Sequence, residues 1–260
     1  MESFLNFYSK AFKRRNSDME RFNNIMEFAT DTVKINKYAL VDIVKSLLFP
    51  MQYALISGLI SESGERGMDF DYFNDFFWND KMLYVWTEMR NKENKVKIKD
   101  DNNNFSLDLR RDVIVSTPWN KKRLLYTLSG LGAGKNKEPW QQDGNHRVET
   151  WLPWGISIVD AGNHSIAAGI ISGDGYLTPD RIYDLSDIFK MVKCDGKNYI
   201  YTGPERLKYY SHRPLHIKPN DILGPVVNVN TACVFEIGRT MVENEIHAWP
   251  DIDFIKINED

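Results

Sequence analysis

The triplet Gly-Asn-His occurs twice in this chain, at residues 144–146 and 162–164, and Ser165 follows the second copy. A glycine turn that opens a helix directs unpaired backbone N–H groups outward at the positive end of the helix dipole, where anions bind. Histidine titrates near neutral pH, so His146 and His164 are candidates for acid–base chemistry on a bound anion. We therefore expect a phosphate-binding site that includes both histidines.

Residues beside the two triplets complete the candidate site. Asp160 stands at the end of a predicted strand, where we expect it to orient a histidine, in preference to Glu149, or to cap the glycine turn. The expected ligand-binding residues belong to the two turns or carry a positive charge: Gly162, Asn163, Ser165, Asn145, Arg147 and Arg123. We expect no catalytic role for Ser165, because no Gly-x-Ser-x-Gly elbow surrounds it.

The second triplet also has a purely structural interpretation. Gly162 and Asn163 tolerate a positive φ, so they suit a tight turn in which His164 and Ser165 cap the helix and contact only protein. The sequence leaves both interpretations open.

The segment between the triplets predicts how they are held. Residues 148–160 are rich in β-branched and aromatic side chains, which indicates one strand or a tight pair of strands bent at Pro153-Trp154-Gly155. The small side chains of residues 165–171 suit a helix packed closely on a sheet. The predicted order is strand, glycine turn, helix.

The run Gly-Ile-Ser-Ile-Val-Asp-Ala-Gly-Asn-His-Ser-Ile-Ala-Ala-Gly-Ile, residues 155–170, is similar to the strand–GxHR–helix element of the ParB/sulfiredoxin-like fold. In that superfamily the element binds nucleotide phosphates or supports phosphoryl chemistry. The resemblance covers about sixteen residues, and Ser165 stands where the pattern has arginine, so Arg147 is the candidate to replace it. It implies a nucleotide ligand, with Mg²⁺ as the candidate companion.

A longer resemblance is to an uncharacterised family of bacterial and prophage proteins. Its members share Asn-His-x-Val-Glu-x-Trp-Leu-Pro-Trp-Gly-Ile, here residues 145–156, followed by Gly-Asn-His-Ser, here residues 162–165. This resemblance implies a prophage or phage-defence setting and brings no established activity.

The composition favours a folded chain without a global affinity for nucleic acid. Of 260 residues, 42% are hydrophobic and 13% aromatic, enough for one large domain or two small ones. The 33 basic and 36 acidic side chains give a net charge of −3, whereas nucleic-acid binding favours a basic surface. Cys194 and Cys233 form no CxxC pair, so we expect a reducing, cytoplasmic setting without thiol chemistry.

We expect neither export nor membrane insertion. The N-terminal residues lack the uninterrupted apolar core of a secretory signal. The most apolar segment, residues 38–60, is interrupted by Asp42, Lys45, Gln52 and Pro50, so it predicts a buried helix pair broken at Pro50.

The predicted fold class is α+β, with a helical N-terminal region packed on a small mixed sheet that carries the strand–GNHS turn–helix element. The expected organisation is a helical region at residues 1–90, a polar loop or boundary at 91–111, and a ParB/sulfiredoxin-like domain at 112–260. The helical region includes a break at residues 14–18. The aromatic cluster at residues 70–78 is expected to be core or a cover over the site.

Within the C-terminal part, turn signals and periodicity predict further elements. These are a strand at 112–116, a helix at 121–131 with Leu124, Leu125 and Leu128 on one side, a short helix at 185–191, a hairpin at 191–201 and a helix or strand near 235–242. The glycines of 128–135 are too close to the lysine for a P-loop, so we expect a helix end and a loop there.

The histidines do not indicate a metal site on one helix face. His146, His164, His212 and His216 lack the HxxxH and HExxH spacings, although a site assembled through space stays open.

Three functions are compatible with these residues. The leading hypothesis is a protein that binds a phosphate-bearing ligand, a nucleotide, and acts on it through His164 and His146; turnover stays open. The first alternative is a noncatalytic prophage or defence-associated interaction protein, in which the two triplets lock a strand to a helix. The second is a ParB-like nuclease, which would need a basic groove containing Arg123, Arg147, His212 and Arg213.

Overall fold

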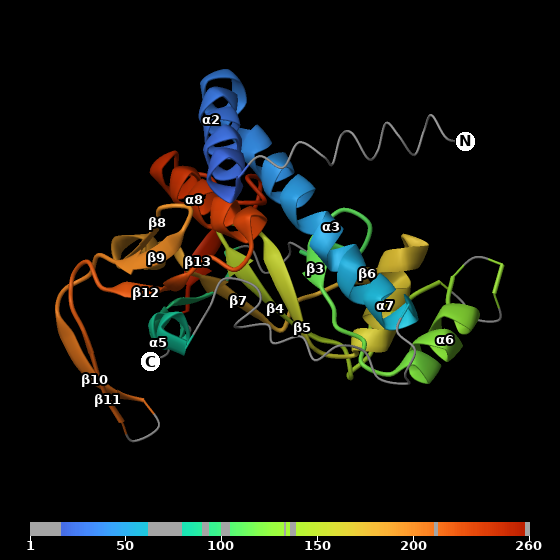
Figure 1. Cartoon of the computed structure of the whole chain (residues 1–260). Helices are drawn as coiled ribbons and strands as arrows, with labels where there is room; N and C mark the ends of the chain where they lie inside the picture. Colours follow the sequence, from blue (N-terminus) through green and yellow to red (C-terminus); the bar gives the residue numbers. More distant parts are fainter. Residues whose placement is uncertain are drawn as a thin grey trace.

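A computed structural model of the chain describes residues 17–61, 80–89, 94–99, 105–132, 134–135, 139–210 and 213–257. The first part of the predicted helical region, residues 1–16, the aromatic cluster at 70–78 and His212 lie outside the described residues. A mixed sheet occupies the centre of the molecule, with helices on both of its faces (Figure 1).

The central sheet has six strands, in the order β13-β1-β7-β4-β5-β3. Their bounds are Phe254–Lys256, Lys95–Ile98, Arg181–Asp184, Arg147–Leu152, Ile156–Ala161 and Val113–Val115. The pairs β3–β5 and β4–β7 are parallel and the other neighbours antiparallel. The predicted α+β class with a mixed sheet is therefore confirmed.

Strands β4 and β5 are the tight pair predicted before the GNHS turn. The bend between them contains Pro153, after a cis peptide bond, and Gly155 with φ +73°. Any side chain at Gly155 would meet the Ala248 side chain, because a Cβ there would lie 2.2 Å from the Ala248 Cβ. The predicted bend is confirmed.

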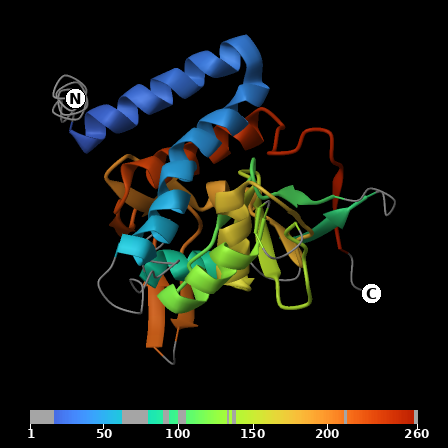
Figure 2. The ribbon, with the colours of Figure 1, turned by 90° about the vertical axis from the view of Figure 1, so that its right-hand side faces the viewer.

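Alternate residues of the sheet serve two apolar cores, because successive side chains point to opposite faces. Val113 and Val115 belong to the core shared with α2 (Asp18–Asn36), α3 (Leu40–Ser61) and α8 (Val229–Glu243). Ile114, between them, belongs to the core covered by α6 (Lys121–Gly130) and α7 (Asn163–Ser172). Helix α3 also contributes Ile56 to this second core, and Figure 2 shows it running from the end of α2 toward α6 and α7.

The first described helix starts where the sequence predicts, and the second continues past the predicted break. Ser17 caps α2, its Oγ accepting a hydrogen bond from the Glu20 N–H at 3.2 Å, so this helix begins at the end of the break predicted at residues 14–18. The predicted helix pair broken at Pro50 is wrong, because Pro50 lies inside the single helix α3. Leu48 before Pro50 and Ile56 after it are both buried, so the helix is packed against the protein on either side of the proline. The break between helices lies instead in the 3-10 turn Lys37–Ala39.

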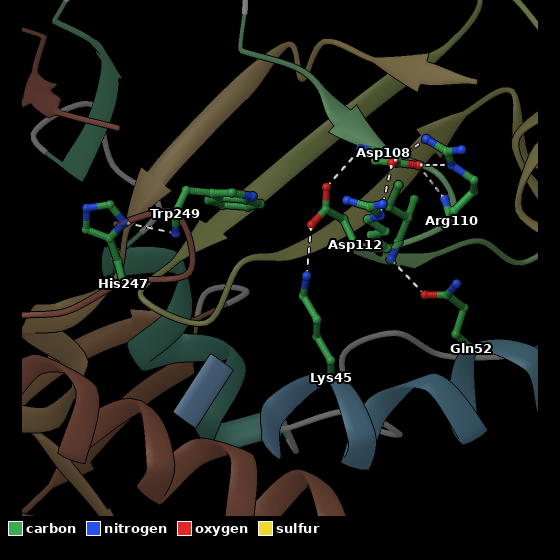
Figure 3. A network of polar contacts seen from close by, with 9 residues as sticks. Lys45, Gln52, Asp108, Arg110, Asp112, His247 and Trp249 are labelled. Atoms are coloured by element: carbon green, nitrogen blue, oxygen red, sulfur yellow. Dashed lines mark hydrogen bonds and ion pairs between the residues drawn. The ribbon is translucent and has the colours of Figure 1, made fainter. Parts of the chain in front are cut away.

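Helix α3 covers the outer edge of strand β3, the last strand of the sheet (Figure 3). Gln52 is 1% exposed, and its Oε1 accepts a hydrogen bond from the Ile114 N–H at 2.8 Å. Lys45 lies 3.3 Å from the Asp112 carboxylate, whose other oxygen accepts from the Asp108 N–H. An uncovered edge strand leaves its N–H groups unpaired, and the Gln52 side chain supplies the acceptor for one of them on β3.

The polar stretch predicted as a loop or boundary contributes an inner strand. Lys95–Ile98 forms β1, between β13 and β7, with Val96 buried. Its lysines conceal the alternation that puts Val96 into the core, so the loop prediction for this part is wrong. Leu125 is a second correction, because this side chain of α6 is exposed and only Leu124 is buried there.

The remaining elements lie around this framework. They are α5 (Asp80–Met89), the 3-10 helix Ser186–Lys190, β8 (Val192–Cys194), β9 (Asn198–Tyr201) and β12 (Ile222–Pro225), with the pairs β2 (Leu107–Asp108)–β6 (Tyr176–Leu177) and β10 (Arg206–Tyr210)–β11 (Arg213–Ile217). The predicted hairpin at residues 191–201 is confirmed as β8–β9. The β10–β11 hairpin projects from the opposite side of the molecule to α6 and α7 (Figure 1).

Among the described residues, one helical stretch, Asp18–Ser61, is long and apolar enough to cross a membrane by length and composition alone. Core helices of soluble proteins pass the same test, and this stretch packs against α8. It is weak evidence for a membrane span.

Candidate functional site

Two parallel strands bring two helix N-termini to one edge of the sheet. Strand β3 leads into α6 and strand β5 into α7, and the two helices pack against each other. Ligands of open α/β sheets bind outside the carboxyl ends of such strands. A cavity of about 470 Å³ lies there, lined by Trp119, Arg123, Tyr126, Thr127, Asn145, Asp160, Ala161, Gly162, Asn163, His164 and Ser165.

The GNHS turn forms one wall of this cavity. Gly162 has φ +84° and ψ +16°, the left-handed conformation, and no side chain caps the helix that follows. In the described part of the chain, the backbone N–H groups of His164 and Ser165 have no acceptor. A left-handed residue followed by a helical one makes a concave array of N–H groups that favours an anion.

His164 is half-buried between this turn and the start of α6. Its Nε2 accepts a hydrogen bond from the Asn120 N–H at 3.0 Å, which requires Nε2 to carry no proton. The neutral ring therefore holds its proton on Nδ1, which has no partner among the described residues. Burial lowers the pKa of His164, and the positive charge of Arg123 lowers it further. Near neutral pH, His164 is a hydrogen-bond donor beside the cavity.

An aromatic and cationic wall faces the turn. The Trp119 ring meets His164 edge to face at 5.4 Å between centroids, and the Arg123 guanidinium lies 5.0 Å from the Trp119 ring centre. Trp119 is 48% exposed and Tyr126 is 68% exposed. Within the described ranges, Arg123 has no carboxylate partner, so its charge is available to a ligand.

The first turn of α6 carries an unusual charge. Lys121, Lys122 and Arg123 follow one another there, and the turn contains no acidic residue. The helix dipole favours anions at this end, and α2 follows that rule with Asp18 and Glu20. The cations of α6 therefore make the cavity edge locally positive, although the chain has a net charge of −3.

Asn163 ties the turn to the loop before α6. Its Oδ1 accepts hydrogen bonds from the Thr117 N–H at 2.7 Å and the Ser116 Oγ at 3.1 Å. Ser116 Oγ also lies 2.8 Å from the Asn163 carbonyl oxygen. Asn163 therefore holds the two helix starts together, and its side chain is engaged in that role.

His146 supports the turn from beneath. It is 5% exposed, and its ring packs against Trp140 at 4.9 Å between centroids. Its Nδ1 accepts a hydrogen bond from the Asp143 N–H at 2.8 Å. A Cβ on Gly162 would come within 2.5 Å of the His146 Cδ2. Burial lowers the pKa of His146, opposed by the Asp143 carboxylate, so this ring is a neutral support that does not line the cavity.

Ser165 borders the cavity with an engaged side chain. The Trp140 indole N–H lies 2.9 Å from the Ser165 carbonyl oxygen and 3.0 Å from its Oγ. Of the flanking residues, Asn145 lines the cavity, whereas Arg147 is exposed at the start of β4 and is not a lining residue. Arg147 therefore does not replace the arginine missing at Ser165.

Asp160 lines the cavity, as expected, with a different partner from the one predicted. Its Oδ2 accepts a hydrogen bond from the Arg181 guanidinium, and no hydrogen bond joins it to a histidine of the described chain. The Glu149 carboxylate, 2% exposed, lies 3.8 Å from the same guanidinium and accepts from the Trp151 indole N–H. The expected Asp–His pair is thus replaced by an Asp–Arg pair.

The basic groove that a nuclease would need does not form from the described residues. Arg123 lies on α6, whereas Arg213 begins β11 on the opposite side of the molecule (Figure 1). His216, on the same hairpin, pairs with Glu205 at 2.6 Å. The described residues also contain no group of three His, Cys, Asp or Glu side chains arranged to hold a metal ion.

A second cavity, of about 290 Å³, lies near the C-terminus, and no sequence pattern indicated it. Its lining is Leu152, Pro153, Asp184, Ser186, Val242, Glu245, Ile246, His247, Asp253 and Phe254. His247 Nδ1 accepts a hydrogen bond from the Trp249 N–H at 3.3 Å (Figure 3). Burial lowers the pKa of His247, and nearby Asp184 and Asp253 oppose that shift.

Four lining residues of the main site were missed by sequence reasoning: the aromatic residues Trp119 and Tyr126, and the small residues Thr127 and Ala161. The available signal was local: three basic residues open a predicted helix without an acidic residue, and a tryptophan stands two positions before the first of them. Their proximity to the GNHS turn follows from the pairing of β3 with β5.

Comparison with known proteins identifies a family without adding a fold or an activity. No curated protein and no solved structure matches the chain, so the ParB/sulfiredoxin-like resemblance is not confirmed. The expectation of an uncharacterised family is confirmed, because residues 8–248 match the family described as "Family of unknown function (DUF6710)". The chain therefore belongs to the DUF6710 family.

Proposed function

We propose that this protein binds a phosphate-bearing ligand, a nucleotide, in the cavity at the N-terminus of α7. The observation that carries the proposal is the uncapped GNHS turn, which opens into a cavity of about 470 Å³ beside Arg123. Helix N-termini and arginine side chains are the two groups that proteins use most directly to bind phosphate.

The phosphate would take its hydrogen bonds from one side of the cavity. The candidate donors are the His164 and Ser165 backbone N–H groups, the His164 Nδ1–H and the Arg123 guanidinium. Hydrogen bonds from charged donors to phosphate are shorter and stronger than neutral ones. Arg123 is therefore expected to contribute most of the affinity that depends on charge.

The aromatic wall supports a nucleotide in preference to inorganic phosphate. Trp119 and Tyr126 keep large exposed surfaces at the cavity, and an aromatic face gains about 1–3 kcal/mol from each stacked base. The cavity volume lies in the range of small-molecule sites. A base would stack on this wall while the phosphate meets the GNHS turn.

For chemistry on the ligand, the proposal assigns different roles to the two histidines. His164 would contact the ligand as a donor and is the candidate for proton transfer. His146 would hold the turn in place, since it is buried behind Gly162. Binding is the core of the proposal, and turnover is a separate measurement on the same site.

The test is thermal stabilisation by inorganic phosphate, AMP, ADP and ATP, each with and without Mg²⁺. A ligand that binds only the native state at one hundred times its Kd adds about 2.7 kcal/mol to the free energy of unfolding. We expect a Tm increase for the wild type that His164→Ala and Arg123→Gln lose. His216→Ala, on the distant β11, is the matched control and keeps the wild-type shift.

The interaction-protein alternative is supported by one specific observation, the burial of His146 and its bond to Asp143. In that function the triplets only lock β4, β5 and α7 together, and the prophage or defence setting would supply a protein partner. No Tm shift with any of the four ligands, in a folded wild type, would favour this alternative over nucleotide binding.

A further inference from the structure

Asp160 places a negative charge on the wall of a cavity that is otherwise suited to an anion. It is aimed there by a β-bulge, since Val159 pairs with Val148 and Ala161 with Arg147, which leaves Asp160 without a partner on β4. Such bulges redirect side chains beside functional sites. An unpaired carboxylate at this position would repel a phosphate.

Arg181 compensates this charge from outside the cavity. It lies on β7, which is separated from β5 by β4, and its Nη2 bonds to the Asp160 Oδ2. The same nitrogen lies 3.8 Å from the buried Glu149 carboxylate. Arg181 does not line the cavity, so its influence on a ligand passes through Asp160.

We infer that Arg181 is a positioning residue that makes the cavity available to anions, and that Asp160 determines which charges the cavity accepts. This inference rests on the proposed function. With Arg181 bound, Asp160 is neutralised and turned toward β7. Without Arg181, its carboxylate presents a full negative charge beside the GNHS turn and competes with the phosphate for the N–H groups.

The experiment is a double-mutant cycle on the full-length protein, with inorganic phosphate as the probe and Kd measured by calorimetry. Arg181→Gln is expected to weaken phosphate binding about tenfold, the size of a like-charge contact near a protein surface. Asp160→Asn should bind at least as tightly as the wild type. The double variant, with Asp160→Asn and Arg181→Gln together, should have a Kd for phosphate within about threefold of that of Asp160→Asn alone.

Arg110→Gln is the matched control. Arg110 also pairs with an aspartate, Asp108 at 2.9 Å, but it lies beside Gly173, at the opposite end of α7 from the cavity. The substitution removes the same charge, and phosphate binding should stay within about threefold of the wild type. If only the net charge of the protein mattered, Arg110→Gln and Arg181→Gln would weaken phosphate binding equally.

A second readout separates electrostatics from a local structural change. The loss of phosphate affinity in Arg181→Gln, relative to the wild type, should shrink as the salt concentration rises from about 0.01 M to 0.5 M. Salt screens charges, because the Debye length is about 10 Å at 0.1 M and shorter above it. Arg181→Lys, which keeps the charge, should bind within about threefold of the wild type. If Arg181→Gln does not fold, the double variant is compared with Asp160→Asn, and binding more than about threefold weaker in the double variant overturns the inference.

The outcomes distinguish this inference from the proposed function. If the wild type binds neither phosphate nor nucleotide, both fail. If the wild type binds and the double variant stays as weak as Arg181→Gln, the inference is overturned and the proposed function stands. Weaker binding in Asp160→Asn would also overturn it, because Asp160 would then contribute directly to ligand binding.

Discussion

Gly162 shows at the scale of one residue why the two Gly-Asn-His triplets are not equivalent. It has φ +84° and faces the His146 ring, whereas a Cβ on Gly144 would meet no atom within 4 Å. Left-handed backbone costs a residue with a side chain about 1–3 kcal/mol, and the close approach to His146 adds to that cost. The two glycines form a matched pair.

Gly162→Ala is therefore expected to lower the free energy of unfolding by at least about 2 kcal/mol. Gly144→Ala should change it by about 0.5 kcal/mol or less, as for ordinary surface positions. Urea unfolding followed by circular dichroism measures both. Equal effects of the two substitutions would contradict the role given to the second turn.

The histidines of the triplets also predict how stability depends on pH. Burial lowers the pKa of His146 in the folded protein, so the unfolded state takes up the proton first as pH falls through about 6.5. The contribution of His146 to stability is complete above that pH and is lost as the pH falls through the lowered folded-state pKa.

His146→Asn tests this sign, because asparagine keeps an acceptor for the Asp143 N–H and does not titrate. Between pH 7.5 and 5.5, the free energy of unfolding should fall less steeply in His146→Asn than in the wild type. Urea titrations at several pH values give both slopes. Identical slopes would mean that His146 takes up its proton equally in the folded and unfolded states.

At the scale of elements, helix α3 acts as a cover for the edge of the sheet. Its buried Gln52 supplies the acceptor that the Ile114 N–H of β3 lacks. Gln52→Leu keeps the apolar contacts of similar volume and leaves that N–H unpaired, at an expected cost of about 1–3 kcal/mol. Ser57→Ala, exposed on the same helix, is the control and should cost about 0.5 kcal/mol or less.

The measurement for this pair is chemical denaturation, with amide hydrogen exchange at Ile114 as the local readout. Faster exchange at Ile114 in Gln52→Leu alone is the expected result. Unchanged exchange would show that the edge of β3 does not depend on Gln52.

At the scale of the whole molecule, the N-terminal helices and the C-terminal sheet share the larger of the two apolar cores. Leu48 of α3 belongs to the same apolar cluster as Trp151 and Trp154 of the β4–β5 region. Leu48 is completely buried, so Leu48→Ala should cost about 2–5 kcal/mol. Because the core is continuous, we expect circular dichroism and tryptophan fluorescence to report one and the same unfolding transition.

Ile60→Ala provides the comparison on the same helix, because Ile60 is half-exposed. It should shift the transition only slightly, whichever of the two probes is used. Two separate transitions in the wild type, or a Leu48→Ala effect seen only by circular dichroism, would show that the helical region unfolds independently of the sheet.

Local sequence determined the segment from β4 to α7. The run of β-branched and aromatic residues, the turn at Pro153 and Gly155, and the small residues after Gly162 all act within about 25 residues of chain. Composition and turn chemistry report such local preferences. The same methods failed at Pro50 and at Lys95–Ile98. In both places tertiary packing, on α8 and between two strands, overrode the local preference.

The sequence by itself determined that Gly162, Asn163 and His164 form a turn that opens a helix after a strand, because that geometry follows from neighbouring residues. Only the tertiary structure decided what faces the turn. Pairing of β3 with β5 brings Trp119 and Arg123 to it, and the order β7-β4-β5 brings Arg181 to Asp160. Contacts between distant segments depend on strand order and register, which residue spacing along one chain does not encode.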